Sequence, residues 1–364
     1  MVFRVFWKVS LCLGLALGAS LSISASAQNA PTNEEILEAW LSSPHADSTR
    51  EAFRHWDTEG EIPGTCAVCH SSTGVSDYLA APQTMPGLID HPVPIGTTVE
   101  CSACHNDGAK DLSEVLFPNG TTVSTPNSSA ICSVCHQGRS SSGQVEASVA
   151  DMDEDIVSAE IKFINIHYAA AASTQLGNTA RGGYQYEGRS YVGPFAHVET
   201  LGTCVSCHNP HDTRVKLESC TTCHQGAADF RAIRTTPLDI LGDGNTTAGI
   251  GVVISQLHDQ LNAAIMTYSQ EIGGGAIVYS GAAYPYFFND LNADGIADPT
   301  ETVFPNAYKS WTPRLLKAAY NYQFVSKDKG AFAHNAHYVI QLMIDSIESL
   351  SEVATVDATG FTRP

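Results

Sequence analysis

The chain is poor in basic residues. Lysine and arginine together number 19 against 38 aspartates and glutamates in 364 residues, which gives a formal net charge of −19 at pH 7. So acidic a protein is repelled by the phosphate backbone of nucleic acids, which excludes general nucleic-acid binding. We expect any partner that docks through charge to present a basic patch.

Long apolar runs are also scarce. The only one, residues 9–23, follows Arg4 and Lys8 and precedes a small-residue Ala-Ser-Ala site, which is the pattern of a secretory leader. It is too short to be a convincing membrane span, and no second run follows it. We therefore predict a signal peptide at residues 1–27, export to the periplasm or the cell surface, and no membrane span in the mature chain. Losing the leader takes the net charge from −19 to −21.

The mature chain also lacks any cysteine outside one repeated motif. The chain has 11 cysteines, of which Cys12 lies in the leader. The other ten fall in five Cys-x-x-Cys-His motifs: Cys66, Cys69 and His70; Cys101, Cys104 and His105; Cys132, Cys135 and His136; Cys204, Cys207 and His208; Cys220, Cys223 and His224. No thiol is left for a disulfide or a nucleophile.

The Cys-x-x-Cys-His motif is typical of c-type haem attachment. The two thiols can add to the two vinyl groups of one haem, and the adjacent histidine reaches the iron as its proximal ligand. A single Cys-x-x-Cys also serves zinc sites and redox dithiols, but five copies with no variation favour haem. We predict five covalently attached haem c groups and no catalytic residues of another kind.

The histidines outside the motifs are candidates for the sixth iron ligand. A haem iron either takes a sixth ligand or leaves that position open, and this choice separates electron carriers from enzymes. Fourteen histidines less the five proximal ones leave nine. We predict distal ligands at seven of them: His45, His55, His91, His167, His197, His211 and His334. His258 is expected to be exposed, and His337 shares a helix face with His334, of which only one can easily bind a given iron.

The spacing and composition of the chain predict two regions. The first cysteines of successive motifs are 35, 31, 72 and 16 residues apart, and the segments between the motifs are rich in Gly, Pro, Ser and Thr. Such segments lack apolar periodicity. We expect a mainly α fold in which extensive irregular loops wrap around stacked haems at residues 28–230. A mainly helical lobe without a haem motif is expected at residues 231–364.

Several elements can be placed within these regions. Thr32 and Glu35 form a capping box that opens a helix, a short helix is expected at residues 48–56, and a helix carrying His167 at residues 161–173. Residues 181–194 are expected to be a loop rich in Gly and Tyr. Helical patterns follow at residues 249–271, 313–324 and 331–351.

An acidic stretch in the second region matches the twelve-residue calcium loop pattern. Its oxygen ligands would be Asp290, Asn292, Asp294, the carbonyl of Ile296, Asp298 and Glu301, with Gly295 at the sharp turn. Pro299 and the lack of a clear preceding helix depart from the standard motif, and an acidic surface turn is the alternative interpretation. We predict bound Ca²⁺ here.

Five motifs at residues 66–224, with CHQGR at Cys135–Arg139 and CHNPH at Cys207–His211, make the chain resemble the bacterial multihaem c-type cytochromes. It is also similar, less specifically, to subunits of extracellular cytochrome filaments, in which haems form a continuous stack and one histidine can come from the neighbouring subunit. Soluble periplasmic shuttles share the same motifs.

The resemblance implies electron transfer through five closely spaced, mostly His/His-ligated haems, in an exported or extracellular conduit able to polymerise. Its partners would be other redox proteins or its own copies. The alternative is a multihaem oxidoreductase that acts on a small nitrogen or sulfur compound at one open haem. No Cys-x-x-Cys-Lys motif, which marks multihaem nitrite reductases with a lysine ligand, is present.

Overall fold

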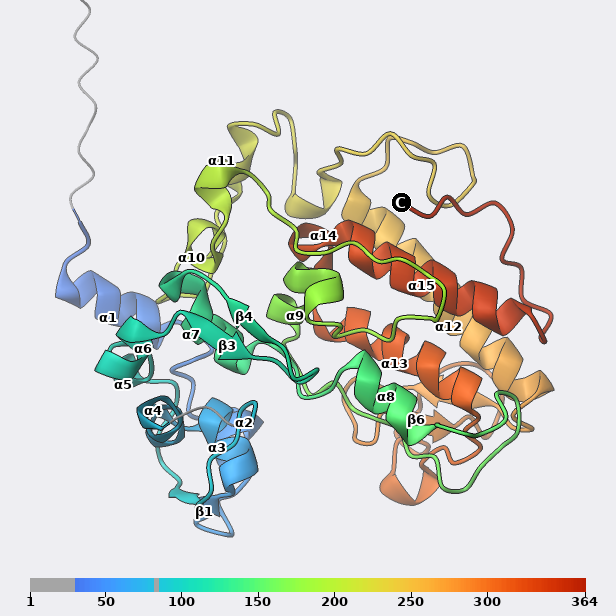
Figure 1. Ribbon diagram of the computed structural model, residues 1–364, viewed down its shortest axis with the longest axis horizontal. Helices are drawn as coiled ribbons and strands as arrows, with labels where there is room; N and C mark the ends of the chain where they lie inside the picture. Colours follow the sequence, from blue (N-terminus) through green and yellow to red (C-terminus); the bar gives the residue numbers. More distant parts are fainter. Residues whose placement is uncertain (1–29, 82–84) are drawn as a thin grey trace, which may run out of the picture.

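The structure is a computed structural model that describes residues 30–81 and 85–364. The signal peptide predicted at residues 1–27 lies outside the described residues. Short helices and loops make up the region on the left of Figure 1, and the long helices α12, α13 and α15 lie on the right. The prediction of a mainly α fold with extensive loops is confirmed. Nowhere in the described ranges is there a helix long and apolar enough to cross a membrane.

The first region is built from short elements. Its helices are α1 (Asn33–Leu41), α2 (Glu51–Arg54), α3 (Gly64–His70), α4 (Ser72–Ala80), α5 (Cys101–Cys104), α6 (Asp107–Asp111), α7 (Asn127–Cys135), α8 (Ser142–Ser148), α9 (Ala171–Leu176), α10 (Cys204–Cys207) and α11 (Leu217–Thr221). Two antiparallel pairs accompany them: β1 (Glu61–Ile62) with β2 (Val93–Pro94), and β3 (Glu114–Leu116) with β4 (Thr122–Ser124). Helices this short are marginal in isolation, so their stability comes from what they pack against.

The first two helices can be compared with their sequence predictions. The capping box predicted for α1 is confirmed, since Thr32 N–H donates to Glu35 Oε2 (2.7 Å) and Glu35 N–H donates to Thr32 Oγ1 (3.2 Å). The helix predicted at residues 48–56 is shorter than expected and is confined to α2.

The second region contains the long helices. They are α12 (Ile250–Glu271), α13 (Pro313–Lys327), α14 (Ala331–His334) and α15 (Ala336–Ser351), with the antiparallel pair β5 (Ile277–Tyr279) and β6 (Phe287–Asn289). The three helices predicted here are confirmed, except that the last one breaks at Asn335, whose side chain caps α15 by accepting from Tyr338 N–H (3.2 Å).

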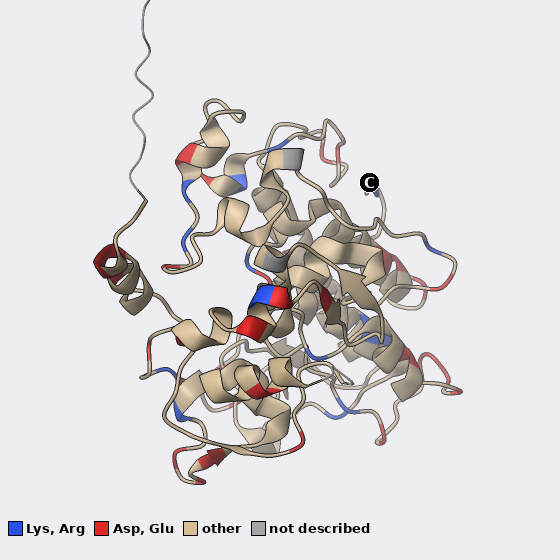
Figure 2. Cartoon of the chain, turned by 60° about the vertical axis from the view of Figure 1, so that its left-hand side comes forward, with Lys and Arg blue, Asp and Glu red and all other residues tan. Residues whose placement is uncertain are grey.

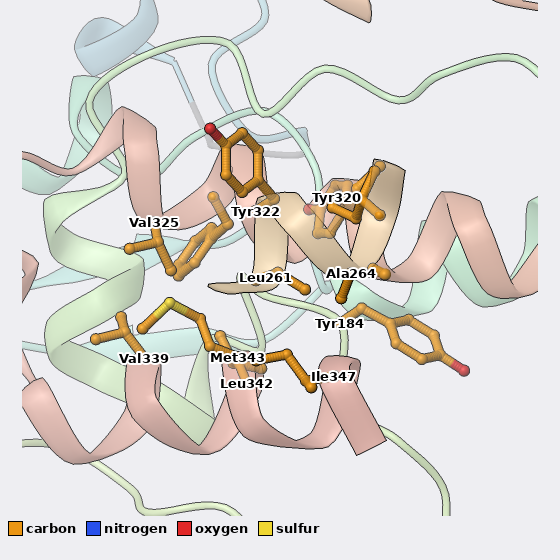
Figure 3. Packing of buried hydrophobic residues seen from close by; sticks show 14 of the residues in the cluster. Tyr184, Leu261, Ala264, Tyr320, Tyr322, Val325, Val339, Leu342, Met343 and Ile347 are labelled. Atoms are coloured by element: carbon orange, nitrogen blue, oxygen red, sulfur yellow. The ribbon is translucent and has the colours of Figure 1, made fainter. Parts of the chain in front are cut away.

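The core between the long helices is apolar and closely packed. Leu261 and Ala264 of α12, Val325 of α13, and Met343 and Ile347 of α15 belong to one buried cluster, which Figure 3 shows from close by. Full burial of a side chain of this size stabilises the fold by about 1.5–3 kcal/mol. The same core includes residues from the stretch between the third and fourth motifs, such as Ile166, Tyr184 and Tyr191.

Extended chain from the first region is buried against these helices and needs hydrogen-bond partners. Buried amide side chains provide them. Asn321 accepts from Tyr184 N–H (2.7 Å) and donates to the Tyr184 carbonyl (3.0 Å). Gln341 accepts from Val192 N–H (2.9 Å), which helps to fix the loop predicted at residues 181–194 against α13 and α15.

The helix predicted at residues 161–173 is wrong over most of its length. Residues 161–170 are not helical, and α9 begins only at Ala171. Ile166 N–H donates to the side chain of Gln323 (2.9 Å) and its carbonyl accepts from Arg139 N–H (3.0 Å), so these tertiary bonds replace helical ones. The chain then turns through His167 at φ 53°, in the left-handed region.

Acidic residues are distributed over loops and helix ends, whereas lysine and arginine are sparse (Figure 2). The few arginines in the second region are engaged within the fold. Arg314 contacts Asp155 (2.7 Å) and Glu352 (2.6 Å), and Arg363 contacts the buried Asp345 (2.8 Å). Such pairing leaves little basic surface there to oppose the net charge.

Candidate haem sites

Each Cys-x-x-Cys-His motif is one turn of helix. In the last four motifs the histidine N–H donates to the carbonyl of the first cysteine at 2.8–2.9 Å, and the first motif lies wholly within α3. Residues three and four apart on a helix are neighbours on its surface. The two thiols and the histidine ring of a motif therefore lie on the same side of the turn, as one haem requires.

The structure brings every motif histidine to one histidine from elsewhere in the chain. The distances between ring centres are 6.0 Å for His70 and His167, 6.2 Å for His105 and His211, 6.2 Å for His136 and His45, 6.3 Å for His208 and His334, and 5.9 Å for His224 and His197. Five pairs thus form from ten different histidines, with one motif in each pair.

This separation fits an iron between the two rings. Imidazole nitrogen binds a metal at about 2.0 Å and lies about 1.1 Å from its ring centre, so two rings on opposite sides of one ion have centres about 6.2 Å apart. Rings in direct stacking contact would be closer, at about 4.5–5 Å. Each site also supplies what a six-coordinate haem c takes from its protein: two thiols to attach the porphyrin and two imidazoles to bind the iron.

Burial keeps several of these rings in the form that binds a metal. It lowers the pKa of His45 and of His70, and it lowers the pKa of His136 and His167 to about 4. Such imidazoles are neutral at pH 7 with one nitrogen free to donate its lone pair.

Hydrogen bonds outside the motifs hold the distal rings. The carbonyl of His45 accepts from Val99 N–H (3.2 Å), and the Trp40 indole donates to the Val99 carbonyl (2.9 Å), which ties the turn after α1 to the chain just before the second motif. His211 follows the fourth motif in a tight turn in which its N–H donates to Asn209 Oδ1 (2.9 Å).

Two more of the five distal rings, His197 and His334, depend on the second region or on chain packed against it. His197 follows Phe195, whose N–H donates to the carbonyl of Gln175 in α9 (2.8 Å). His334 ends α14, and its Nδ1–H donates to both carboxylate oxygens of Asp328 at 2.9 Å. Burial by itself would lower the pKa of His334, but the hydrogen bond to Asp328 and the negative charge of that carboxylate act together to raise this pKa.

Two predicted distal histidines are not brought to a motif histidine. The His55 side chain is 61% exposed and pairs with Glu51 (2.8 Å), while its ring contacts Trp56. His91 is exposed and pairs with Asp90 (2.8 Å) and Asp77 (3.2 Å). Carboxylates rather than a facing imidazole thus engage both rings. In the sequence His55 and His91 precede a motif by 11 and 10 residues, and the paired His197 precedes one by seven.

The two histidines left aside have different surroundings. His337 is exposed, but His258 is half-buried, because its ring stacks on Tyr322 (3.9 Å) and its Nε2 meets the Tyr322 carbonyl (2.9 Å). The expectation that His258 is exposed is therefore wrong. Asp328, the hydrogen-bond partner of His334, was not predicted. No sequence pattern identifies a carboxylate six residues before a histidine as its partner.

The motifs do not meet in the order of the sequence. Cys135 Sγ in the third motif reaches the carbonyl of Val68, which lies inside the first motif (3.8 Å). The helix of the third motif contacts the fourth motif, since Cys204 N–H donates to Ser129 Oγ (3.0 Å). The third motif therefore lies between the first and the fourth.

The predicted calcium loop is organised by its own side chains. Asp290 accepts from Gly295 N–H (2.8 Å), Asp294 accepts from Ile296 N–H (2.8 Å), and Glu301 accepts from Leu291 N–H (2.8 Å). Asp290 and Glu301, at the two ends of the loop, are only 6% and 3% exposed. Across the described residues, however, no group of three or more His, Cys, Asp or Glu side chains is arranged to hold a metal ion.

Comparisons with known proteins identify two named relatives. The chain is 26% identical to the C-type polyheme cytochrome OmcB of Geobacter sulfurreducens over 399 aligned positions, which cover 91% of this chain and 50% of OmcB. It is 27% identical to the C-type polyheme cytochrome OmcC of the same species, over 94% of this chain and 50% of OmcC. The chain thus spans about half the length of the curated relatives it matches.

No family model and no solved structure matches the chain. Both named relatives are polyhaem cytochromes, and each alignment extends over at least 91% of the chain, so it includes the motif-free region as well as the motifs. The resemblance of this chain to the bacterial multihaem c-type cytochromes, predicted from its five motifs, is thereby confirmed.

Proposed function

We propose that the protein transfers electrons through five covalently attached haems, each bound by two histidines. The observation that carries this proposal is that every motif histidine faces one other histidine, with ring centres 5.9–6.3 Å apart. The haem iron supplies a one-electron couple when bound. The chain's cysteines would anchor the haem, and its paired imidazoles would bind the iron and so keep small ligands from it.

The competing function is an oxidoreductase with one open haem. Such an enzyme needs an iron whose sixth position is free for substrate. In the part of the chain that the structure describes, each of the five motif histidines already has a facing imidazole. This arrangement favours the electron carrier, and the relatives' names support the same class of protein.

The contacts between motifs support a path for the electrons. Because the third motif touches the first and the fourth, a haem on the third motif would lie between the haems of those two. The fifth motif is 16 residues beyond the fourth. His211, which faces the second motif, is only three residues beyond His208 and so brings the second haem beside the fourth. The proposed path thus runs from the first motif through the third to the fourth and branches there to the second and the fifth.

We propose that the protein works outside the cytoplasm and exchanges electrons with other redox proteins or with its own copies. All five ring pairs form within one chain, so none of them needs a histidine from a neighbouring copy. Polymerisation stays a prediction, which electron microscopy of the exported protein tests directly.

Calcium at Asp290–Glu301 also remains a proposal. The burial of Asp290 and Glu301 supports it, since a carboxylate taken out of water needs a compensating charge. The lack of a preformed cage in the described residues means that the loop would have to tighten around the ion.

The proposed function is tested on the purified exported protein. Intact mass and a haemochrome assay should give five haems per chain, and the ferric protein should be wholly low-spin with no carbon monoxide binding after reduction. A high-spin signal together with carbon monoxide binding in the wild type would instead identify an open haem and support the oxidoreductase.

A further inference from the structure

One of the ten paired histidines differs from the others in what its second nitrogen contacts. Nδ1 of His334 donates to both oxygens of Asp328 at 2.9 Å, and the Asp328 side chain is only 3% exposed. Among the paired histidines, all of which are described, His334 alone has a carboxylate partner. Nδ1 of His70 and of His208 donate to the backbone carbonyls of Ala52 (2.8 Å) and Thr213 (3.2 Å), which carry no net charge.

The fold holds this carboxylate in place. Asp328 follows the last residue of α13, where its N–H donates to the Val325 carbonyl (3.3 Å). Its Oδ1 also accepts from Gly330 N–H (3.0 Å), and its carbonyl accepts from Ala331 N–H (3.0 Å). The short turn between α13 and α14 therefore fixes both Asp328 and the helix that carries His334.

Within the described residues, no lysine or arginine neutralises the Asp328 carboxylate by direct contact. Arg231 and Lys329 line the same small cavity as Asp328. Neither they nor any other lysine or arginine that the structure describes, however, forms an ion pair with it. Its charge therefore acts on His334 through the hydrogen bond and on whatever lies beyond the ring.

A carboxylate that accepts from a ligating imidazole makes that ligand more basic. A more basic ligand, and a buried negative charge near the iron, stabilise the ferric state more than the ferrous state. Axial-ligand character and hydrogen bonding of this kind are the means by which proteins tune haem potentials. Because the interior around Asp328 is shielded from water, the effect is screened less than at an exposed site.

We propose that Asp328 lowers the reduction potential of the haem bound by His208 and His334, and that it does so by its charge. The inference depends on the proposed histidine ligation. It makes Asp328 a positioning and tuning residue rather than an iron ligand. Since the fourth motif touches the third, the haem with the lowered potential would lie inside the proposed path rather than at its end.

The test is a spectroelectrochemical titration of the holoprotein carrying Asp328→Asn. Asparagine keeps the shape and an oxygen acceptor but removes the charge. We expect one of the five haem transitions to move to a higher potential by at least tenfold in its equilibrium constant, which is 59 mV for a one-electron couple. All five haems should remain low-spin, and Asp328→Glu should retain a potential close to that of the wild type. Asp77→Asn, which removes an exposed partner of the unpaired His91, is the matched control and should shift nothing.

The variant His334→Ala tests the ligation of the iron by His334 separately from the effect of Asp328 on the potential. If it leaves all five haems low-spin, the ligation itself is wrong. If it creates one high-spin haem while Asp328→Asn shifts no transition, the ligation stands and the tuning is refuted. A high-spin haem in Asp328→Asn would also overturn the proposal, because the carboxylate would then only hold the ring in place.

Discussion

Replacing His45 tests the least expected pairing in the molecule. His45 lies 21 residues before Cys66, so its position in the sequence favours the first motif. In the structure its ring instead faces His136 of the third motif, with centres 6.2 Å apart. His45→Ala removes the imidazole and leaves a methyl group, which has no lone pair and cannot bridge that gap. We expect the third haem to lose its sixth ligand.

The size of the effect follows from the number of motifs. One open iron among five makes about one fifth of the total haem high-spin in the ferric protein, and reduction should give one carbon monoxide bound per chain. The control is His55→Ala, because the His55 side chain is 61% exposed and pairs with Glu51. It should leave the protein wholly low-spin with no carbon monoxide bound.

A second background identifies the haem that is affected. In a protein whose third motif is removed by Cys132→Ala and Cys135→Ala, His45→Ala should open no further iron. In a protein whose first motif is removed by Cys66→Ala and Cys69→Ala, it should still open one. The assignment of His45 to the third motif is refuted if the His45→Ala protein binds no carbon monoxide. It is also refuted if His45→Ala still opens an iron after the third motif has been removed.

Three further outcomes are expected. Arg363→Ala leaves the buried Asp345 with only the longer contact to Arg189 (3.9 Å) and should lower the free energy of unfolding by up to about 3 kcal/mol in a denaturant titration. The exposed pair of Arg54 provides the control, for which Arg54→Ala should cost at most about 1 kcal/mol. Chelation should lower the Tm, and Glu301→Gln should mimic it in the presence of calcium, whereas the exposed Asp259→Asn should not; an unchanged Tm with chelator and no calcium by elemental analysis would reduce the loop to an acidic turn. Finally, replacing both cysteines of any one motif should lower the haem content from five to four per chain, and retention of five would show that the assignment of one haem to each motif is wrong.

The local chemistry of the motifs could be predicted from the sequence. A cysteine pair three residues apart followed by histidine needs only one helical turn to align its three side chains, and that turn is a local structure. The excess of acidic residues and the capping box at Thr32 are local properties as well, as are the apolar stripes of α12 and α15. Each could therefore be predicted without knowing which parts of the chain meet.

Tertiary structure alone decided which histidine faces which motif. His55, His91 and His197 carry nearly the same signal in the sequence, yet only His197 is brought to a motif histidine. The segment before His167 has the composition of a helix but is not helical, because buried Gln323 and the backbone of Arg139 bind polar groups of Ile166. Two rings pair only when segments far apart in the sequence pack together, and His208 and His334 are 126 residues apart. A local sequence pattern cannot predict such packing.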